Sequence, residues 1–256
     1  MGLQTLDRAV AVLQALGAGG ASGMRFVDLQ KSLGLSKPTL HRMLRALLSH
    51  GLIELLPLSR HYCLGRGLQI LARSAPKAVP DLQRICAPAV QCLAEESGDT
   101  VFLMARDGLF TVCLGRATGD YPIRTITVEV GSRRPLGIGA GGLAILGALP
   151  DQEADRIITA LLPKLSAYPL ASAEQIRKSH KMARRNGFAL SDEKVAAGVR
   201  GVAVAIHDVD GTPIATIGLA GIPKRMSTDR IPVLVGLLKR ERALIEKALA
   251  AGTPGG

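Results

Sequence analysis

The stretch LGLSKPTLHRMLRALL, residues 33–48, decides the fold of the N-terminal region. Gly34 interrupts an apolar run, and Ser36 offers a side-chain oxygen to cap a following helix. Pro38 falls in the first turn of that helix, where its missing N–H costs no hydrogen bond. At about 100° per residue, one arc carries Leu40, Met43, Leu44, Leu47 and Leu48, and the other carries Thr39, His41, Arg42 and Arg45. The pattern predicts a helix with one face for a core and one face for anions.

A short helical run over residues 25–33 precedes this helix, and three residues join the two. That spacing is typical of a helix-turn-helix, whose second helix lies in the major groove of DNA. No acidic residue occurs between Asp28 and Glu54, so no neighbour in the sequence neutralises the basic face. An isolated basic helix is as often a solvated face, but the preceding helix favours DNA binding.

A small hairpin is expected after the basic helix. Residues 52–56 and 61–64 read as two short strands, and residues 57–60 turn the chain between them. An earlier helix, with apolar residues at helical spacing from Leu6 to Leu16, completes three helices and a hairpin, the pattern of a winged helix-turn-helix. Arg60 at the hairpin tip is a candidate for contact with a phosphate or the minor groove; the alternative is an exposed turn residue.

The charge of the chain is concentrated where DNA contact is expected. The 256 residues carry a net charge of +11. Residues 1–80 hold ten Lys and Arg against three acids, or +7, and the remaining 176 residues hold 22 against 18, or +4. Such an excess beside the basic helix is typical of a phosphate-binding surface.

The composition indicates a soluble, cytoplasmic protein without a metal or cofactor. The four cysteines form no C-x-x-C pair and have no histidine cluster beside them, which favours buried reduced thiols. Asp7 and Arg8 interrupt the apolar N-terminus, so no signal peptide is expected. No apolar run approaches the roughly 18–20 residues that a membrane span needs.

The remaining sequence predicts a second domain of the α+β class. We expect a DNA-binding domain over residues 1–66, a linker helix over 67–80, a second domain over 81–250 and a flexible tail over 251–256. Predicted hairpins pair residues 101–106 with 109–114 and residues 201–208 with 212–221, and residues 123–130 alternate as a half-buried strand does. Predicted helices cover residues 81–97, 140–149, 151–162 and 172–186, and a final helix carries Leu234, Leu238, Ile245 and Leu249 on one stripe. The domain is therefore expected to be an antiparallel sheet flanked by helices.

A glycine-rich segment, residues 137–142, is the clearest candidate for ligand contact in this domain. It lacks the Lys-Ser/Thr of a P-loop and the spacing of a dinucleotide fingerprint. The favoured interpretation is a loop that enters a helix, whose exposed N–H groups can bind a ligand carboxylate. No serine sits in a nucleophile elbow, and no catalytic residues are predicted.

Taken together, these motifs resemble the IclR-type family of bacterial transcription regulators over residues 6–249. The resemblance rests on the basic helix, on YCLG at residues 62–65, on VGSRRPL at residues 130–136 and on DEKVAAGVR at residues 192–200. It implies a winged helix-turn-helix, a linker helix and a GAF-like effector-binding domain. It also implies homodimers, or dimers of dimers, that bind a palindromic operator in double-stranded DNA.

The basic helix and the hairpin tip supply the DNA-binding candidates, and the resemblance implies the effector-binding candidates. The DNA-binding candidates are Ser36, Lys37, Thr39, His41, Arg42, Arg45 and Arg60. The effector-binding candidates are Ile123, Ile126, Arg134, Ala140, Gly141, Ser191, Gly201, Gly218 and Ala220.

The effector candidates depart from the polar set that family members use for small oxo-acids. Gly201, Gly218 and Ala220 carry no polar side chain. Because such a pocket leaves the charge of a small acid desolvated, we expect a larger aromatic or acyl carboxylate. Arg134 would pair with the carboxylate; the alternative is an exposed loop arginine.

We therefore expect a DNA-binding transcription regulator switched by a small molecule. Two alternatives remain open. One is an enzyme built on the second domain with an accessory winged helix. The other is an adaptor whose winged helix binds a protein or RNA without sequence-specific contact to DNA.

Overall fold

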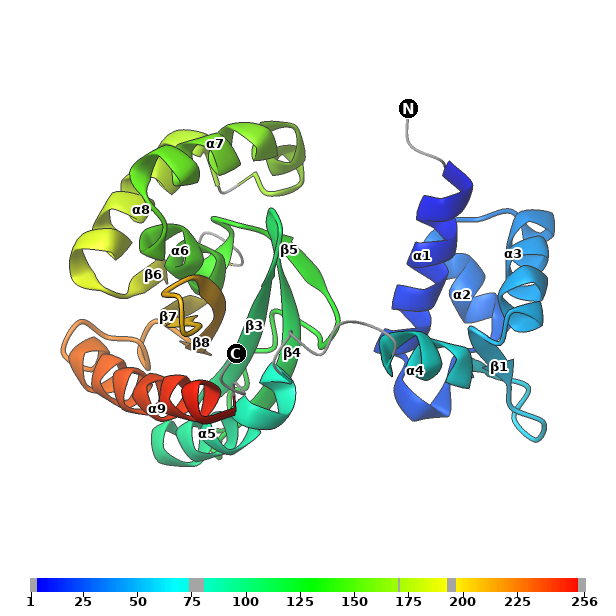
Figure 1. Cartoon of the computed structure of the whole chain (residues 1–256), viewed down its shortest axis with the longest axis horizontal. Coiled ribbons are helices and arrows are strands. Elements are labelled where there is room, and N and C mark those ends of the chain that lie inside the picture. Colours follow the sequence, from blue (N-terminus) through cyan, green and yellow to red (C-terminus); the bar gives the residue numbers. More distant parts are fainter. Residues whose placement is uncertain (1–3, 74–80, 170, 193–196, 253–256) are drawn as a thin grey trace. The chain divides into compact units, whose positions relative to one another are not determined.

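The structure is a computed structural model that describes residues 4–73, 81–169, 171–192 and 197–252. The chain divides into two compact units, Met1–Val79 and Pro80–Gly256 (Figure 1). Residues 251 and 252 of the expected tail are helical, and residues 253–256 lie outside the described residues, as do residues 74–80 of the expected linker helix.

The N-terminal unit contains the predicted three helices and hairpin. Its elements are α1 (Gln4–Ala18), a 3₁₀ turn (Gly20–Ser22), α2 (Phe26–Leu33), α3 (Lys37–Ser49), β1 (Ile53–Leu55), β2 (Tyr62–Leu64) and α4 (Arg66–Arg73). β1 and β2 pair antiparallel, with Ile53 opposite Leu64. The linker helix expected from Gly67 is α4, which begins one residue earlier.

The core of this unit confirms the predicted apolar face of α3. Leu40, Met43, Leu44 and Leu47 are buried, whereas Leu48 is half-buried. They pack with Val12, Leu16, Leu29 and Ile53 from the other elements of the unit. Each fully buried side chain of this kind contributes about 1.5–3 kcal/mol, so this cluster holds α3 onto its own unit.

The turn between α2 and α3 differs from the sequence prediction in one detail. Gly34 ends α2 in the left-handed conformation, at φ 61°, as a C-terminal glycine does. Ser36 takes the N-cap position of α3, but its hydroxyl makes no capping hydrogen bond. It lies 2.8 Å from the Thr39 hydroxyl instead, so the cap predicted for this side chain is wrong.

The C-terminal unit is an antiparallel sheet flanked by helices, as predicted for an α+β domain. Its helices are α5 (Leu82–Ser97), α6 (Gly139–Ala148), α7 (Asp151–Leu161), a 3₁₀ segment (Leu162–Ala167), α8 (Ala173–Asn186) and α9 (Ile231–Gly252). Its strands are β3 (Thr100–Asp107), β4 (Phe110–Thr118), β5 (Arg133–Pro135), β6 (Ala189–Asp192), β7 (Arg200–His207) and β8 (Pro213–Gly221). Within the described residues these form one six-stranded sheet in the order β5-β4-β3-β8-β7-β6.

The strand predicted over residues 123–130 is wrong. The chain there is irregular, and its buried residues Thr125 and Val128 are three apart rather than two. Ile123 and Ile126 are 55% and 47% exposed. The edge position beside β4 belongs to β5, where Pro135 lies opposite Phe110. Pro135 is tolerated in β5 because β5 is an edge strand. With only three residues, β5 is too short to show the alternating pattern from which a strand is predicted.

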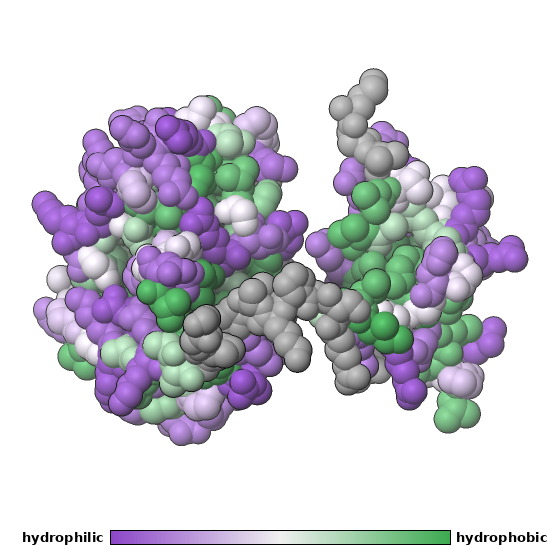
Figure 2. Space-filling view, in the orientation of Figure 1, coloured by the Kyte–Doolittle hydropathy of each residue, from purple (hydrophilic) through white to green (hydrophobic). Residues whose placement is uncertain are grey.

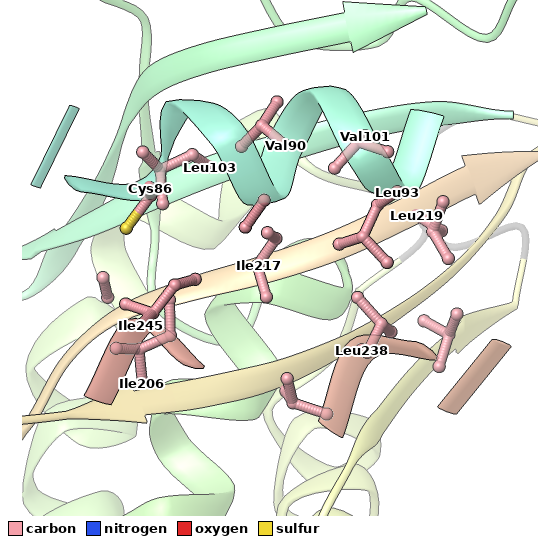
Figure 3. Close-up of a cluster of buried hydrophobic side chains, with 14 of the residues drawn as sticks. Cys86, Val90, Leu93, Val101, Leu103, Ile206, Ile217, Leu219, Leu238 and Ile245 are labelled. Atoms are coloured by element: carbon pink, nitrogen blue, oxygen red, sulfur yellow. The ribbon is translucent and has the colours of Figure 1, made fainter. Parts of the chain in front are cut away.

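The two faces of the sheet are covered differently. Alternate residues of β3, β7 and β8, among them Leu103, Ile206 and Ile217, pack against α5 and α9 (Figure 3). On this same face, Val90 and Leu93 of α5 and Leu238 and Ile245 of α9 pack against these strand residues (Figure 3). The opposite face is covered by α6, with α8 packed outside it. Residues of the intervening positions therefore face α6.

A buried ion cluster fixes the segment that leads into α9. The Asp99 carboxylate, 2% exposed, accepts from Arg225 Nε at 3.0 Å and from Arg230 Nη1 at 2.6 Å. Both guanidinium groups also donate to the Ser97 carbonyl. Arg225 lies over the Tyr121 ring, 4.4 Å from its centroid. These contacts tie the turn between α5 and β3 to the loop between β8 and α9.

Replacement of Asp99 by Asn should strongly destabilise the C-terminal unit. It leaves two partly buried guanidinium groups without their carboxylate, which costs about 3 kcal/mol of unfolding free energy. Asp155→Asn is the control, because Asp155 is 60% exposed in its pair with Arg177 and such a pair contributes less than about 1 kcal/mol. Urea denaturation followed by circular dichroism measures both; equal losses would contradict this account of the cluster.

Candidate functional site

The exposed face of α3 brings the predicted DNA-contact residues together. Ser36, Lys37, His41, Arg42 and Arg45 are exposed, and Thr39 is half-buried. Among the described residues, no acidic side chain pairs with the three cations of this face. The face therefore presents positive charge and hydrogen-bond donors, the groups that bind phosphates and base edges.

A ring contact orients one of these residues. The His41 ring lies against Phe26 of α2, with centroids 4.5 Å apart and a 32° angle between the planes. Stacking of this kind restricts the rotamers of the exposed ring. Sequence reasoning missed Phe26, because the two residues belong to different helices and only the packing brings them together.

Arg60 occupies the turn between β1 and β2. It is exposed, and it is the one non-glycine residue of the described chain with positive φ, at 57°. Its backbone N–H donates to the Leu56 carbonyl at 2.9 Å, which closes the turn. The hairpin tip is therefore exposed to solvent and carries the positive charge of Arg60.

A cavity that opens to solvent lies between the sheet and the first turn of α6. Seven of the nine candidate effector residues line it: Arg134, Ala140, Gly141, Ser191, Gly201, Gly218 and Ala220. Ile123 and Ile126 do not line it, because the irregular segment that carries them leaves both side chains largely in solvent. The apolar wall expected from these two isoleucines comes instead from Phe102, Met104 and Val128. Sequence reasoning missed these three.

The small residues of the cavity have two separate effects. A Cβ at Gly201 would lie 3.3 Å from the Ala140 Cβ, closer than an ordinary contact, so the glycine allows α6 to approach β7 closely. A Cβ at Gly218 would lie 2.7 Å from the Ala203 Cβ and 2.8 Å from the Val202 carbonyl oxygen. Gly218 is therefore required for the close pairing of β7 with β8 in the sheet. The missing side chain of Gly218 does not widen the cavity.

The N-terminus of α6 opens into this cavity, as the glycine-rich segment suggests. Residues Gly139 to Gly142 line the cavity, and Ile138 precedes them without a side-chain cap. The first N–H groups of a helix have no partner inside the helix and favour negative charge. The backbone thus supplies donors at a cavity whose side chains are mostly apolar.

Arg134 supplies a cation to the same cavity. Its Nη2 donates to the Thr127 carbonyl, and it has no acidic partner among the described residues. Burial lowers the pKa of this guanidinium, because desolvation disfavours its charged form. The neighbouring Arg133 turns outward, pairs with Asp107 at 2.6 Å and lies over the Phe110 ring. Arg134 is therefore not the exposed loop arginine of the alternative interpretation.

Thr216 contributes an unsatisfied hydroxyl to the wall of the cavity. The residue is 1% exposed, and its Oγ1 has no hydrogen-bond partner. Gly141 lies directly above it, since a Cβ there would come within 2.9 Å of that oxygen. A buried polar atom without a partner retains its desolvation cost.

Thr216→Val should stabilise the ligand-free protein. The change keeps the branched shape and removes the unpaired hydroxyl, which raises the unfolding free energy by about 1 kcal/mol. Thr111→Val is the control, because Thr111 is equally buried but its hydroxyl donates to the Arg134 carbonyl. Denaturant titration compares the two; a Thr216→Val protein less stable than wild type would contradict the prediction.

The described residues show neither a metal cluster nor a helix that could cross a membrane. No group of three or more His, Cys, Asp or Glu side chains in them is arranged to hold a metal ion. None of their helices is both long enough and apolar enough to span a bilayer.

Comparison with known proteins identifies both units. The family described as IclR helix-turn-helix domain matches residues 5–57, and the family described as bacterial transcriptional regulator IclR C-terminal matches residues 78–245. The glycerol operon regulatory protein of Streptomyces griseus is 27% identical over 252 residues, covering 98% of each chain. The transcriptional repressor AllR of Klebsiella pneumoniae is 29% identical and covers 94% of this chain and 88% of its own.

Solved structures agree in fold. An IclR homologue from Microbacterium hydrocarbonoxydans, complexed with 4-hydroxybenzoate, has a TM-score of 0.71 at 21% identity and covers 97% of this chain and 100% of its own. An IclR regulator from Alicyclobacillus acidocaldarius also has a TM-score of 0.71, at 22% identity, with 96% and 99% coverage. With a helix-turn-helix unit and a sheet unit that both match, the chain belongs to the IclR family of bacterial transcriptional regulators.

Proposed function

We propose that this regulator senses an aromatic or acyl carboxylate through Arg134. The observation that carries the proposal is a desolvated guanidinium without an acidic partner, among the described residues, in the wall of an apolar cavity. A carboxylate at that position forms charge-assisted hydrogen bonds and neutralises the charge. The donors at the start of α6 lie at the same cavity and favour the same sign of ligand charge.

The remaining cavity wall favours a ligand with a large apolar body. Phe102, Met104, Val128 and Ala220 form an apolar cluster there. Cys113 beneath them is held as a neutral thiol, because burial raises its pKa to about 11. A small oxo-acid would leave this surface uncovered. The homologue complexed with 4-hydroxybenzoate supports an aromatic acid as one candidate for this chain.

For DNA, the proposed contact surface is the exposed face of α3 in the major groove. Lys37, Arg42 and Arg45 contact phosphates or guanine edges, and Thr39 and His41 contact base edges, with His41 oriented by Phe26. Ser36 donates at the start of the helix, and Arg60 contacts a phosphate or the minor groove.

A homodimer, or a dimer of dimers, is the proposed form on a palindromic operator. The N-terminal unit exposes apolar side chains on two helices: Leu6 and Val10 of α1, at 61% and 43%, and Ile70 and Leu71 of α4, at 65% and 61%. Figure 2 shows hydrophobic surface on this unit. Burial of these side chains against a second copy would stabilise the pair and bring two α3 helices to half-sites about 34 Å apart.

The proposed switch is a difference in ligand affinity between two dimer geometries, since a ligand that binds both equally shifts neither. The protein is proposed to act in this way without catalysis, in the cytoplasm. The neutral Cys113 thiol is a poor nucleophile at pH 7, which disfavours the enzyme alternative.

Arg134→Met should weaken binding of a carboxylate by about tenfold to a hundredfold, because it removes a charge-assisted hydrogen bond. The matched control is Arg133→Met, since Arg133 pairs with Asp107 and does not line the cavity. Calorimetry with 4-hydroxybenzoate, benzoate and octanoate measures the change. Equal affinity of the Arg134→Met and wild-type proteins for every acid that binds would contradict the assignment.

Arg42→Ala should weaken operator binding by about 1–3 kcal/mol. If Arg42 contacts a phosphate, the loss is uniform across sequences and the salt slope falls by about one unit; a guanine contact relaxes specificity at one position instead. Arg185→Ala is the control, because it removes the same charge from an exposed position of α8. Fluorescence anisotropy at two salt concentrations distinguishes these results, and an Arg42→Ala protein that binds like the control would refute the contact.

A further inference from the structure

The chain between β4 and β5 forms one wall of the cavity. Thr127 and Val128 of this segment line the cavity. Val128 is 9% exposed and packs with Phe102, Met104 and Cys113 in the apolar cluster described above. The position of this segment therefore sets the shape of the ligand site.

Main-chain hydrogen bonds hold only the two ends of the segment. At its start the Tyr121 N–H donates to the Gly98 carbonyl at 3.1 Å, and at its end the Gly131 N–H donates to the Cys113 carbonyl at 2.8 Å. Residues 122–128, here called the strap, lie between these anchors. No main-chain hydrogen bond joins the strap to itself or to any other described residue. A segment of this kind opens at a lower free energy than the strands beside it.

Two arginine side chains tie the strap to the sheet. Arg134 Nη2 donates to the Thr127 carbonyl. Arg116 Nη1 donates to the Val128 carbonyl at 3.3 Å and to Glu129 Oε2 at 3.0 Å. The two arginines belong to the paired strands β5 and β4. Opening of the strap breaks these hydrogen bonds, which are strengthened by the charge of their donors.

Arg134 can hold the strap and a ligand at the same time. A guanidinium carries five N–H donors, and the Thr127 carbonyl occupies one of them. No acidic side chain of the described residues pairs with the others. A carboxylate on these remaining donors neutralises the desolvated charge and fixes the guanidinium where it holds Thr127. A ligand bound in this way favours the closed strap.

We propose that the strap is a movable wall of the ligand site, which a carboxylate on Arg134 holds closed. Arg116 is a positioning residue, because it does not line the cavity and acts on the ligand only through the Val128 carbonyl. This inference rests on the proposed carboxylate site and adds the segment of the chain that responds to the ligand.

Arg124 allows the closure of the strap to be measured. It is exposed within the strap, and trypsin cleaves after arginine. When the strap recloses faster than it is cut, the rate of cleavage follows the population of the open form. Mass spectrometry of the digested full-length protein distinguishes the cut between Arg124 and Thr125 from cuts at other basic residues.

Without a ligand, Arg134→Met and Arg116→Met should each speed this cut by about tenfold, because each removes a charge-assisted hydrogen bond to the strap. Arg133→Met is the control, since Arg133 pairs with Asp107 and lies over the Phe110 ring. Circular dichroism checks that each variant is folded, and glutamine replaces methionine in one that is not. Cleavage of both tether variants at the wild-type rate would overturn the inference.

With a ligand, the cut in the wild-type protein should become slower. The probes are 4-hydroxybenzoate, benzoate and octanoate, each at about a hundred times its dissociation constant from calorimetry, where binding to the closed form alone slows the cut by up to about a hundredfold. Arg116→Met should still be protected, whereas Arg134→Met should lose most of the protection at the same concentration. A peptide substrate in the same tube controls for inhibition of trypsin by the acid.

The outcomes separate the strap from the carboxylate site. An acid that binds by calorimetry but leaves the cut after Arg124 unchanged would overturn the movable wall while the carboxylate site stands. Failure of every acid to bind would overturn the carboxylate site and closure by the ligand together. The two tether variants would still decide whether Arg134 and Arg116 hold the strap.

Discussion

The packing of α5 and α9 on one face of the six-stranded sheet is the constraint on which the C-terminal unit depends. That face supplies a continuous core from Leu82 to Leu249 (Figure 3). The Asp99 ion cluster adds to this core, and the opposite face carries a second buried core under α6 and α8. The cavity lies at the start of α6, where the lining residues Ala140, Gly141 and Gly201 have a small side chain or none. The core with α5 and α9 and the cavity thus lie on opposite faces of the same strands.

In the N-terminal unit, α3 likewise has one face that packs in the core and one face that is exposed. The buried leucines of α3 hold the helix in its unit, and most polar side chains on the other arc are exposed to solvent. The two faces carry different residues because a side chain that packs against Leu29 in the core cannot also reach a base edge. The stacking of His41 on Phe26 restricts an exposed side chain that we propose contacts DNA.

Much of this was predictable from local sequence pattern, and the failures have local causes. Amphipathic spacing predicted α3, and Asp107-Gly108 and Asp210-Gly211 predicted the two long hairpins. Residues 123–130 alternate in the sequence but do not pair, because the edge of β4 is occupied by β5. The resemblance implies Ile123 and Ile126 as cavity residues, but Phe102 and Met104 provide that wall. The unpaired hydroxyl of Thr216 depends on its packing against Gly141, which is distant in the sequence, so no local pattern predicts it.

This regulator should recognise a particular DNA sequence, and one titration tests that specificity directly. Fluorescence anisotropy would compare the intergenic DNA upstream of the protein's own gene with a scrambled duplex of equal length, each at two salt concentrations. A specific regulator should prefer its operator by about a thousandfold or more. Equal and steeply salt-dependent binding to both, followed by a random-sequence selection that returns no motif, would contradict the account and favour a sequence-blind adaptor.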